Sequence, residues 1–143
     1  MRGVDTNVLA RYCFLDDPDQ DEIAVKYMYS ASDQNPIFIS HTALVELHWL
    51  FMSKRYQKTK EDWIQCVDLL LQMRGIVIQE YGAVATALYK YRNCTSTKVG
   101  FADCLIQAVS EHKGCTYTFS FDKHAQLIGM TGPEDEPVVV DEL

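Results

Sequence analysis

Four acidic residues stand in stretches where solubility alone does not explain an acid. Asp5 directly follows Val4 near the start of the chain, and Asp122 ends the run "TYTFSF". Glu46 is the only acid in "TALVELHWLFM", and Asp103 is the only acid in "GFADCLIQAV". Burying an unpaired carboxylate costs several kcal/mol, so a shared partner would explain all four. A hard divalent cation is such a partner, because Mg²⁺ and Mn²⁺ prefer carboxylate and water oxygens.

Each acid also has an ordinary structural explanation. Asp5 and Asp103 stand at the starts of predicted helices, where Asp commonly accepts hydrogen bonds from backbone N–H groups. Glu46 fits the solvent-exposed face of a helix equally well. Capping and exposure explain any one of these residues, but they do not explain why all of them map to one edge of a predicted sheet.

The elements that would position these acids follow from the hydrophobic pattern. Short apolar runs alternate with longer segments of helical periodicity, and strands of about five residues between helices of ten or more predict a parallel sheet covered by helices. We therefore predict an α/β fold, a three-layer α/β/α sandwich with a central parallel sheet. The predicted strands lie at 2–5, 36–40, 75–79 and 115–121, and the main predicted helices at 23–32, 41–52, 59–73, 80–92 and 101–114.

Apolar spacing also predicts which side of a helix is buried, because residues three and four apart share a face. The predicted core positions are Ile23, Tyr27 and Ala31 in the helix at 23–32, Trp63, Ile64, Val67, Leu70 and Leu71 in the helix at 59–73, and Ala102, Leu105, Ile106 and Val109 in the helix at 101–114.

The predicted topology brings the four acids to one rim. In open parallel sheets, sites form beyond the carboxyl ends of the strands. Asp5 and Asp122 follow predicted strands, and Asp103 opens a helix. Glu46 lies in the second turn of the helix after residues 36–40, and helical side chains lean toward the helix N-terminus. All four carboxylates are therefore expected at the same edge of the sheet.

The length of 143 residues suits one domain with one core. We place this domain at residues 1–130, followed by an acidic C-terminal segment at 131–143 in which "PVVV" predicts a short edge strand. That segment carries five acids and no Lys or Arg, so residues 1–130 hold only −2 of the net charge of −7. "SKRYQKTK" gathers four basic residues, for which a solvated helix end is favoured over an RNA contact. Net charge neither supports nor excludes nucleic acid.

Several classes of protein are disfavoured. No run approaches the about 18–20 apolar residues of a membrane span, and the N-terminus lacks a signal-peptide core, so we expect a cytoplasmic protein without a membrane partner. Five cysteines without a C-x-x-C pair indicate buried, reduced thiols rather than disulfides or a zinc site. The four histidines lack the spacing of zinc ligands.

Four stretches resemble, in order and spacing, the motifs of the PIN-domain ribonucleases, and most closely those of VapC-type toxins of bacterial and archaeal toxin–antitoxin pairs. They are "VDTNVLARYCFLDDP", "TALVELHWLF", "FADCLIQA" and "TFSFDKHA", and the resemblance spans residues 4–129. It implies one acidic, metal-binding catalytic centre formed by Asp5, Glu46, Asp103 and Asp122. Asn7, from the first motif, and Ser120, beside the last acid, are expected as supporting residues. Gly100 departs from the pattern, because many relatives carry a further Asp there.

The implied activity is that of an endoribonuclease dependent on Mg²⁺ or Mn²⁺. Carboxylates that hold such a cation activate water and stabilise the charge that builds on a phosphodiester. Single-stranded regions of structured RNA are the expected substrate, because their bases are exposed. The resemblance also implies a VapB-type antitoxin that inhibits the enzyme by placing an Arg or Lys near the acidic rim. We also expect a homodimer, because tyrosines occupy more than one face of two helices, at Tyr27, Tyr29, Tyr81, Tyr89 and Tyr91.

Two other functions are consistent with part of this pattern. A PIN-like RNA- or protein-binding module that has lost catalysis is the alternative, although the presence of all four acids disfavours it. A phosphoacceptor receiver domain also places an Asp at a strand end, but it requires a paired acid after the first strand. Asn7 stands where a D-x-D phosphotransferase needs its second Asp. We also find no Gly-rich phosphate loop and no Ser or Cys nucleophile with a matching His base.

Overall fold

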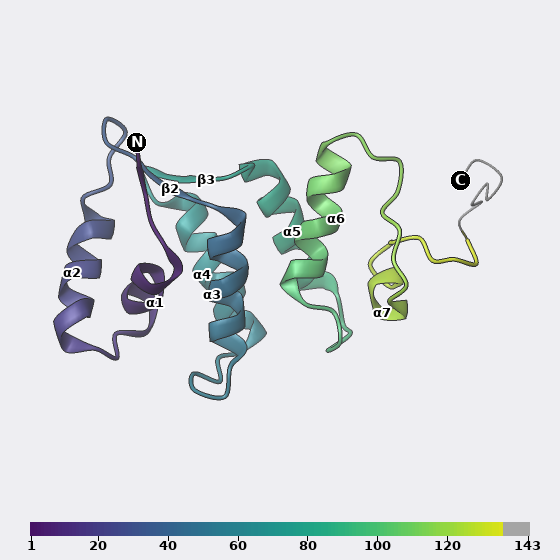
Figure 1. Cartoon of the computed structure of the whole chain (residues 1–143), viewed down its shortest axis with the longest axis horizontal. Helices are drawn as coiled ribbons and strands as arrows, with labels where there is room; N and C mark the ends of the chain where they lie inside the picture. The colour runs from purple at the N-terminus through teal and green to yellow at the C-terminus, as the bar shows by residue number, and fades with distance from the viewer. Residues whose placement is uncertain (136–143) are drawn as a thin grey trace. The chain divides into compact units, whose positions relative to one another are not determined.

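The computed structural model describes residues 1–135 and divides into two compact units, Met1–Tyr81 and Gly82–Leu143 (Figure 1). All the strands that the described residues form lie in the first unit. They are β1 (Arg2–Gly3), β2 (Ile37–Ile39) and β3 (Ile76–Ile78). The first unit is therefore the part of the chain in which a sheet edge can position a site.

The three strands form one parallel sheet in the order β1–β2–β3 (Figure 1). In its register, Gly3 pairs with Phe38, and Phe38 pairs with Val77. Parallel strands need long crossover connections, and here each crossover consists of two helices. These are α1 (Thr6–Phe14) and α2 (Pro18–Tyr29) before β2, and α3 (His41–Met52) and α4 (Lys60–Gln72) before β3. The predicted α/β class with a parallel sheet is confirmed.

Side-chain caps set the starts of these helices. Asp17 accepts a hydrogen bond at the start of α2 and is followed by Pro18 in the first helical turn. Ser40 Oγ accepts from the backbone N–H of Ala43 at 3.1 Å and starts α3 directly after β2. Thr59 and Asp62 form a reciprocal capping box at the start of α4. These caps satisfy N–H groups that have no partner within the helix.

The core of the first unit lies between the sheet and its helices. Its side chains without exposed surface include Leu9, Met28, Ile37, Ile39, Leu44, Leu47, Trp63 and Val67. The predicted stripe of α4 is confirmed at Trp63, Val67 and Leu70, which are buried. Ile64 and Leu71 are only half-buried. The predicted stripe of α2 is wrong, because Ile23 is 70% exposed and the helix instead buries Ala24 and Met28. The predicted face of α2 and the face that contains Met28 both carry apolar residues, and packing against other elements buries the face that contains Met28.

The second unit contains α6 (Phe101–His112), α7 (Lys123–Gln126) and all but the first residue of α5 (Tyr81–Asn93). Leu105 is buried as predicted, whereas Ile106 is 56% exposed, so that part of the α6 stripe is wrong. Gln107 is buried instead. Its Oε1 accepts a hydrogen bond from Lys90 Nζ at 2.9 Å, which offsets the cost of burying its amide.

The strand predicted at 115–121 is also wrong. Within residues 1–135, this segment forms a single parallel bridge, from Phe119 to Thr131, rather than a regular strand. Two backbone hydrogen bonds flank it, from Ser120 N to Thr131 O at 2.9 Å and from Thr131 N to Thr118 O at 2.8 Å. Alternating aromatic residues gave the segment its strand pattern, but a strand also needs a neighbour along its length. The edge strand predicted at 137–140 lies outside the described residues.

Two further expectations concern membranes and thiols. No helix in residues 1–135 is long and apolar enough to cross a membrane. The five cysteines are free thiols, as predicted. Their burial is uneven, because Cys104 is buried and Cys115 is exposed, while the remaining three are partly buried.

Candidate metal-binding site

Two of the four predicted ligands share a cavity in the first unit. Asp5 and Glu46 line it together with Asn7, which the sequence singled out as a supporting residue. We refer to this space, of about 470 Å³, as the acidic cavity; it is lined by Asp5, Thr6, Asn7, Glu46, Trp49 and Leu50. The cavity therefore joins the first predicted motif to the second.

Asp5 owes its position to the sheet and to α1. It follows β1 by two residues and has an extended backbone with φ of −96°, so it is the N-cap of α1. Its Oδ1 accepts a hydrogen bond from the backbone N–H of Val8 at 3.2 Å. This bond fixes the side chain at the positive end of the helix dipole, which favours negative charge. Within residues 1–135, Oδ2 has no hydrogen-bond or ion-pair partner and is available to a ligand.

Glu46 is held by α3, which begins immediately after β2. Its side chain is exposed, and within the described part of the chain its carboxylate makes no hydrogen bond or ion pair. Since β1 and β2 are parallel neighbours, the elements that follow them start at the same edge of the sheet. Asp5 and Glu46 line the same cavity, whereas the convergence of all four carboxylates on one rim stays a prediction.

The other two predicted ligands lie in the second unit, each at the start of a helix. Asp103 is not the N-cap of α6, which is Gly100, but the third helical residue. Its Oδ2 accepts a hydrogen bond from the backbone N–H of Gly100 at 2.9 Å. Asp122 is the N-cap of α7, where its Oδ1 accepts from His124 N at 2.8 Å.

Ser120 lies beside Asp122, as expected, but through a turn rather than along a strand. Its Oγ accepts a hydrogen bond from the backbone N–H of Asp122 at 3.0 Å. The hydroxyl therefore positions the backbone at the start of α7.

Each unit by itself offers carboxylate oxygens of the kind that a hard cation prefers. Asp5, Asp103 and Asp122 each use one carboxylate oxygen as a cap, and within residues 1–135 the second oxygen of each has no partner. Mg²⁺ takes such single carboxylate oxygens and completes its shell with water. Among residues 1–135, no group of three or more His, Cys, Asp or Glu side chains is gathered closely enough to hold a metal ion. Each unit thus carries two of the predicted ligands.

Arg11 takes part in a polar network that the sequence did not reveal. Its guanidinium lies 3.2 Å from Asp16 and donates to the hydroxyl of Tyr56 at 3.1 Å. That hydroxyl donates to Asp16 at 2.7 Å, and Arg55 pairs with the same carboxylate at 2.8 Å. The hydrogen bond from Tyr56 is the main reason why the pKa of Asp16 is lowered. Arg55 and Tyr56 belong to the basic segment "SKRYQKTK", so this part of the segment anchors the end of α1.

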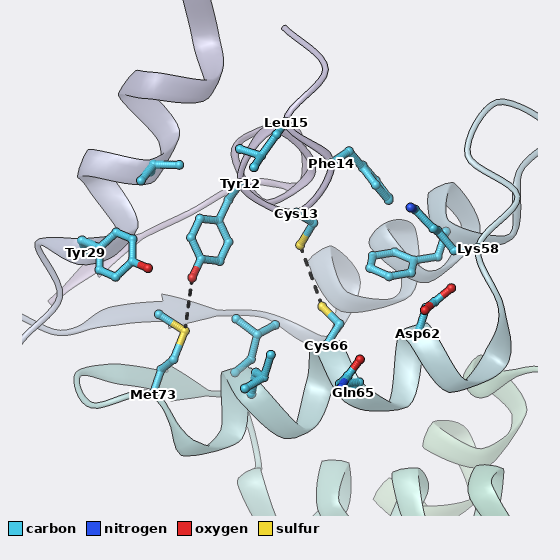
Figure 2. Close-up of a pocket in the computed structure, with 14 residues that line it drawn as sticks. Tyr12, Cys13, Phe14, Leu15, Tyr29, Lys58, Asp62, Gln65, Cys66 and Met73 are labelled. Carbon is cyan, nitrogen blue, oxygen red and sulfur yellow. Dashed lines mark hydrogen bonds between the residues drawn. The ribbon is translucent and has the colours of Figure 1, made fainter. Parts of the chain in front are cut away.

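A second and more apolar cavity of about 520 Å³ lies between α1, α2 and α4 (Figure 2). Two pairs of its lining side chains contact one another. Tyr12 donates its hydroxyl proton to Met73 Sδ at 3.8 Å, and the sulfur atoms of Cys13 and Cys66 are 3.8 Å apart. We refer to this space as the thiol cavity. Its contacts join residues about fifty to sixty positions apart, which no sequence spacing could have indicated.

The family model that describes the PIN domain matches residues 4–129, which include all four predicted ligands. No curated protein matches the chain.

Proposed function

The chain belongs to the PIN domain family, whose members are generally nucleases, and from this premise we propose that it is an endoribonuclease dependent on Mg²⁺ or Mn²⁺. Its proposed substrates are single-stranded regions of structured RNA, where bases and backbone are accessible. The observation that carries this proposal is the acidic cavity, in which Asp5 and Glu46 lie together with carboxylate oxygens that have no partner in residues 1–135.

The proposed ligand set is the one that the resemblance of the four motifs implies. Asp5 and Asp103 are the proposed direct ligands, each through the oxygen that its capping hydrogen bond leaves free. Glu46 and Asp122 complete or orient the site. When bound, the divalent cation supplies positive charge next to the phosphodiester and lowers the pKa of a bound water molecule.

The remaining residues of the site hold these carboxylates in place. The backbone N–H groups of Val8 and Gly100 fix Asp5 and Asp103 in single orientations, so less side-chain freedom is lost when a ligand binds. Asn7 lines the acidic cavity and offers an amide for hydrogen bonds to substrate. Ser120 is proposed to position Asp122 through its backbone hydrogen bond.

The finer assignment is to a VapC-type toxin that acts in the cytoplasm and is held inactive by a VapB-type antitoxin. It rests on the resemblance of the four motifs. An Arg or Lys of the antitoxin next to Asp5 and Glu46 would occupy the position of the cation. The proposed homodimer is supported by three large aromatic side chains that remain exposed, those of Tyr29, Tyr81 and Tyr89. Tyr91, also expected to contribute, is instead buried, and Tyr27 is half-buried.

The proposal is tested by incubating the purified full chain with a labelled RNA hairpin in Mg²⁺, in Mn²⁺ and in EDTA. We expect cleavage in the loop with either cation and none in EDTA. Asp103→Asn should abolish cleavage, while Asp19→Asn, which changes an exposed Asp in the first turn of α2, should not. Binding of the hairpin without cleavage under all conditions would instead identify a PIN-like module that has lost catalysis. Asp103→Asn cleaving at the wild-type rate would contradict the proposed site.

A further inference from the structure

The acidic cavity contains one large aromatic side chain. Trp49 lines it, three residues after Glu46 on α3, and its side chain is 61% exposed. Residues three apart on a helix lie about 5–6 Å apart at their Cβ atoms. An indole ring thus stands one helical turn away from a carboxylate of the proposed site.

Packing within the first unit does not account for this indole. The other tryptophan, Trp63, is completely buried and packs edge-on against His48 with ring centroids 5.1 Å apart. Single exposed apolar residues are common on protein surfaces. Trp49 differs from them because it lies in a concave space, next to Glu46 and Asn7, where polar groups and one apolar surface converge as they do in ligand sites.

We propose that the Trp49 indole is a platform on which one unpaired base of the RNA substrate stacks. This inference rests on the proposed function, because the base that stacks on Trp49 belongs to the nucleotide next to the phosphodiester bound at Asp5 and Glu46. Every base has a π face, so stacking supplies affinity without sequence preference. Bases within a duplex are already stacked on their neighbours, so the platform selects single-stranded RNA over double-stranded RNA.

Fluorescence isolates this residue cleanly, because the chain has only two tryptophans. In a Trp63→Phe protein, Trp49 is the only indole. Its emission is followed while a single-stranded oligoribonucleotide, or a duplex of the same composition, is added in Ca²⁺, with RNA integrity checked after each titration. Anisotropy of labelled RNA reports binding independently. We expect the single strand, but not the duplex, to quench Trp49.

Substitutions then separate stacking from simple contact. Replacing a stacking ring typically weakens binding by about 5- to 150-fold, which corresponds to about 1–3 kcal/mol per base. We expect such a loss, and a matching rise in KM, for Trp49→Leu. Trp49→Tyr, which keeps an aromatic face, should restore most of the affinity. Tyr29→Leu removes an exposed ring of the same unit outside the acidic cavity and should leave binding unchanged.

Each outcome decides the inference. RNA that binds or is cleaved without quenching Trp49 overturns the stacking platform and leaves the proposed nuclease intact. Quenching by single strands in Ca²⁺, together with no cleavage of the same RNA in Mg²⁺ or Mn²⁺, supports the platform and removes the proposed activity. RNA that neither binds nor is cleaved overturns both. Trp49→Leu that changes only the oligomeric state in light scattering, with RNA affinity unchanged, assigns the ring to contact with a second copy and overturns the platform.

A second inference rests on an independent observation in the thiol cavity. Cys13 on α1 and Cys66 on α4 are both partly buried, and their sulfur atoms are 3.8 Å apart (Figure 2). The hydrogen bond between them lowers the pKa of the Cys13 thiol and raises that of Cys66. Both line a cavity that solvent can enter, so a small oxidant has access.

We infer that Cys13 and Cys66 are a redox pair that a peroxide oxidises to a disulfide. The Cys13 thiolate attacks one oxygen of hydrogen peroxide, the O–O bond breaks, and the leaving hydroxide takes up the proton released by Cys13 to form water. Cys66 Sγ then attacks the sulfur of the resulting sulfenic acid. The S–O bond breaks, and the hydroxyl leaves with the Cys66 proton as a second water. The sulfur atoms must approach to about 2.05 Å.

The test is hydrogen peroxide treatment of the full chain, followed by peptide mapping. We expect a Cys13–Cys66 disulfide, a melting temperature raised by several degrees, and reversal by dithiothreitol. In Cys66→Ser, Cys13 should accumulate as a sulfenic acid that a dimedone probe labels, whereas Cys115→Ser, which removes an exposed thiol, should still form the disulfide. Oxidation at Cys115 without a Cys13–Cys66 disulfide overturns the pair.

Discussion

Helix α3 presents two faces with opposite properties. On one face, Glu46 and Trp49 are exposed and line the acidic cavity. On the other, Leu47, His48 and Phe51 are buried in the core. His48 packs against the ring of Trp63, whereas within residues 1–135 the Glu46 carboxylate has no hydrogen bond or ion pair. The buried face of α3 thus serves stability and its exposed face serves the proposed chemistry. Substitutions on one face should therefore change one of these properties without the other.

The largest expected effect is on the exposed face. Glu46→Gln keeps the size of the side chain but removes a charge from the proposed metal site. Loss of an outer-shell group typically costs 10–100-fold, so removal of a ligand should lower RNA cleavage by more than about 100-fold. The free energy of unfolding should change by less than about 0.5 kcal/mol, because the residue is exposed. Glu22→Gln, at an exposed pair with Lys26, is the control for charge. If Glu46→Gln cleaves RNA at the wild-type rate, the exposed face of α3 does not serve the proposed chemistry.

On the buried face, Leu47→Ala should act in the opposite way. Leu47 has no exposed surface, and its truncation leaves a cavity in the core. We expect urea unfolding to show a loss of about 2–5 kcal/mol, while the folded fraction retains its affinity for Mn²⁺. Leu69→Ala, at a position that is 60% exposed, should cost much less. Equal losses in the two variants would contradict the assignment of Leu47 to the core.

His48 should make this face sensitive to pH. Burial lowers its pKa to about 4, whereas an unfolded histidine titrates near about 6.5. Between these values the unfolded chain binds a proton that the folded chain does not. Above about pH 6.5, His48 therefore does not change the free energy of unfolding. As pH falls from there toward 4, the free energy of unfolding decreases by up to about 3 kcal/mol. Urea unfolding of wild type and of His48→Gln across this pH range measures this loss of stability. If the free energies of unfolding of the two proteins depend on pH in parallel, His48 is not its cause.

The smallest effect is expected where α1 meets the basic segment. Tyr56→Phe keeps the ring that stacks on Phe14, with the two ring centroids 3.7 Å apart. It removes the hydroxyl that donates to Asp16. The unfolding free energy should fall only slightly, because solvent screens this exposed hydrogen bond, and the pKa of Asp16 should rise toward its ordinary value. Titration of Asp16 by NMR checks the second expectation. An unchanged pKa would show that Arg11 and Arg55 determine it instead.

Local patterns predicted the parts of the structure that depend on local chemistry. The helix after "PIFIS" begins where Ser40 caps it, and Asp5 and Glu46 reach one sheet edge because parallel strands require it. Packing against other elements decided the rest. Which stripe of α2 is buried, and whether Gln107 replaces Ile106 in α6, depend on neighbours distant in sequence. The pairing of Cys13 with Cys66 depends on the same kind of contact.

The central claim is that Asp5 is a metal ligand as well as a helix cap, and calorimetric titration with Mn²⁺ tests it most directly. Asp→Asn at an N-cap is nearly neutral for stability, and removing one of several mutually repelling charges offsets any loss. We expect wild type and Asp19→Asn to bind Mn²⁺, and Asp5→Asn to lose binding while its melting temperature without metal stays equal or rises. Wild-type Mn²⁺ affinity in Asp5→Asn would contradict the account and leave Asp5 as a cap alone.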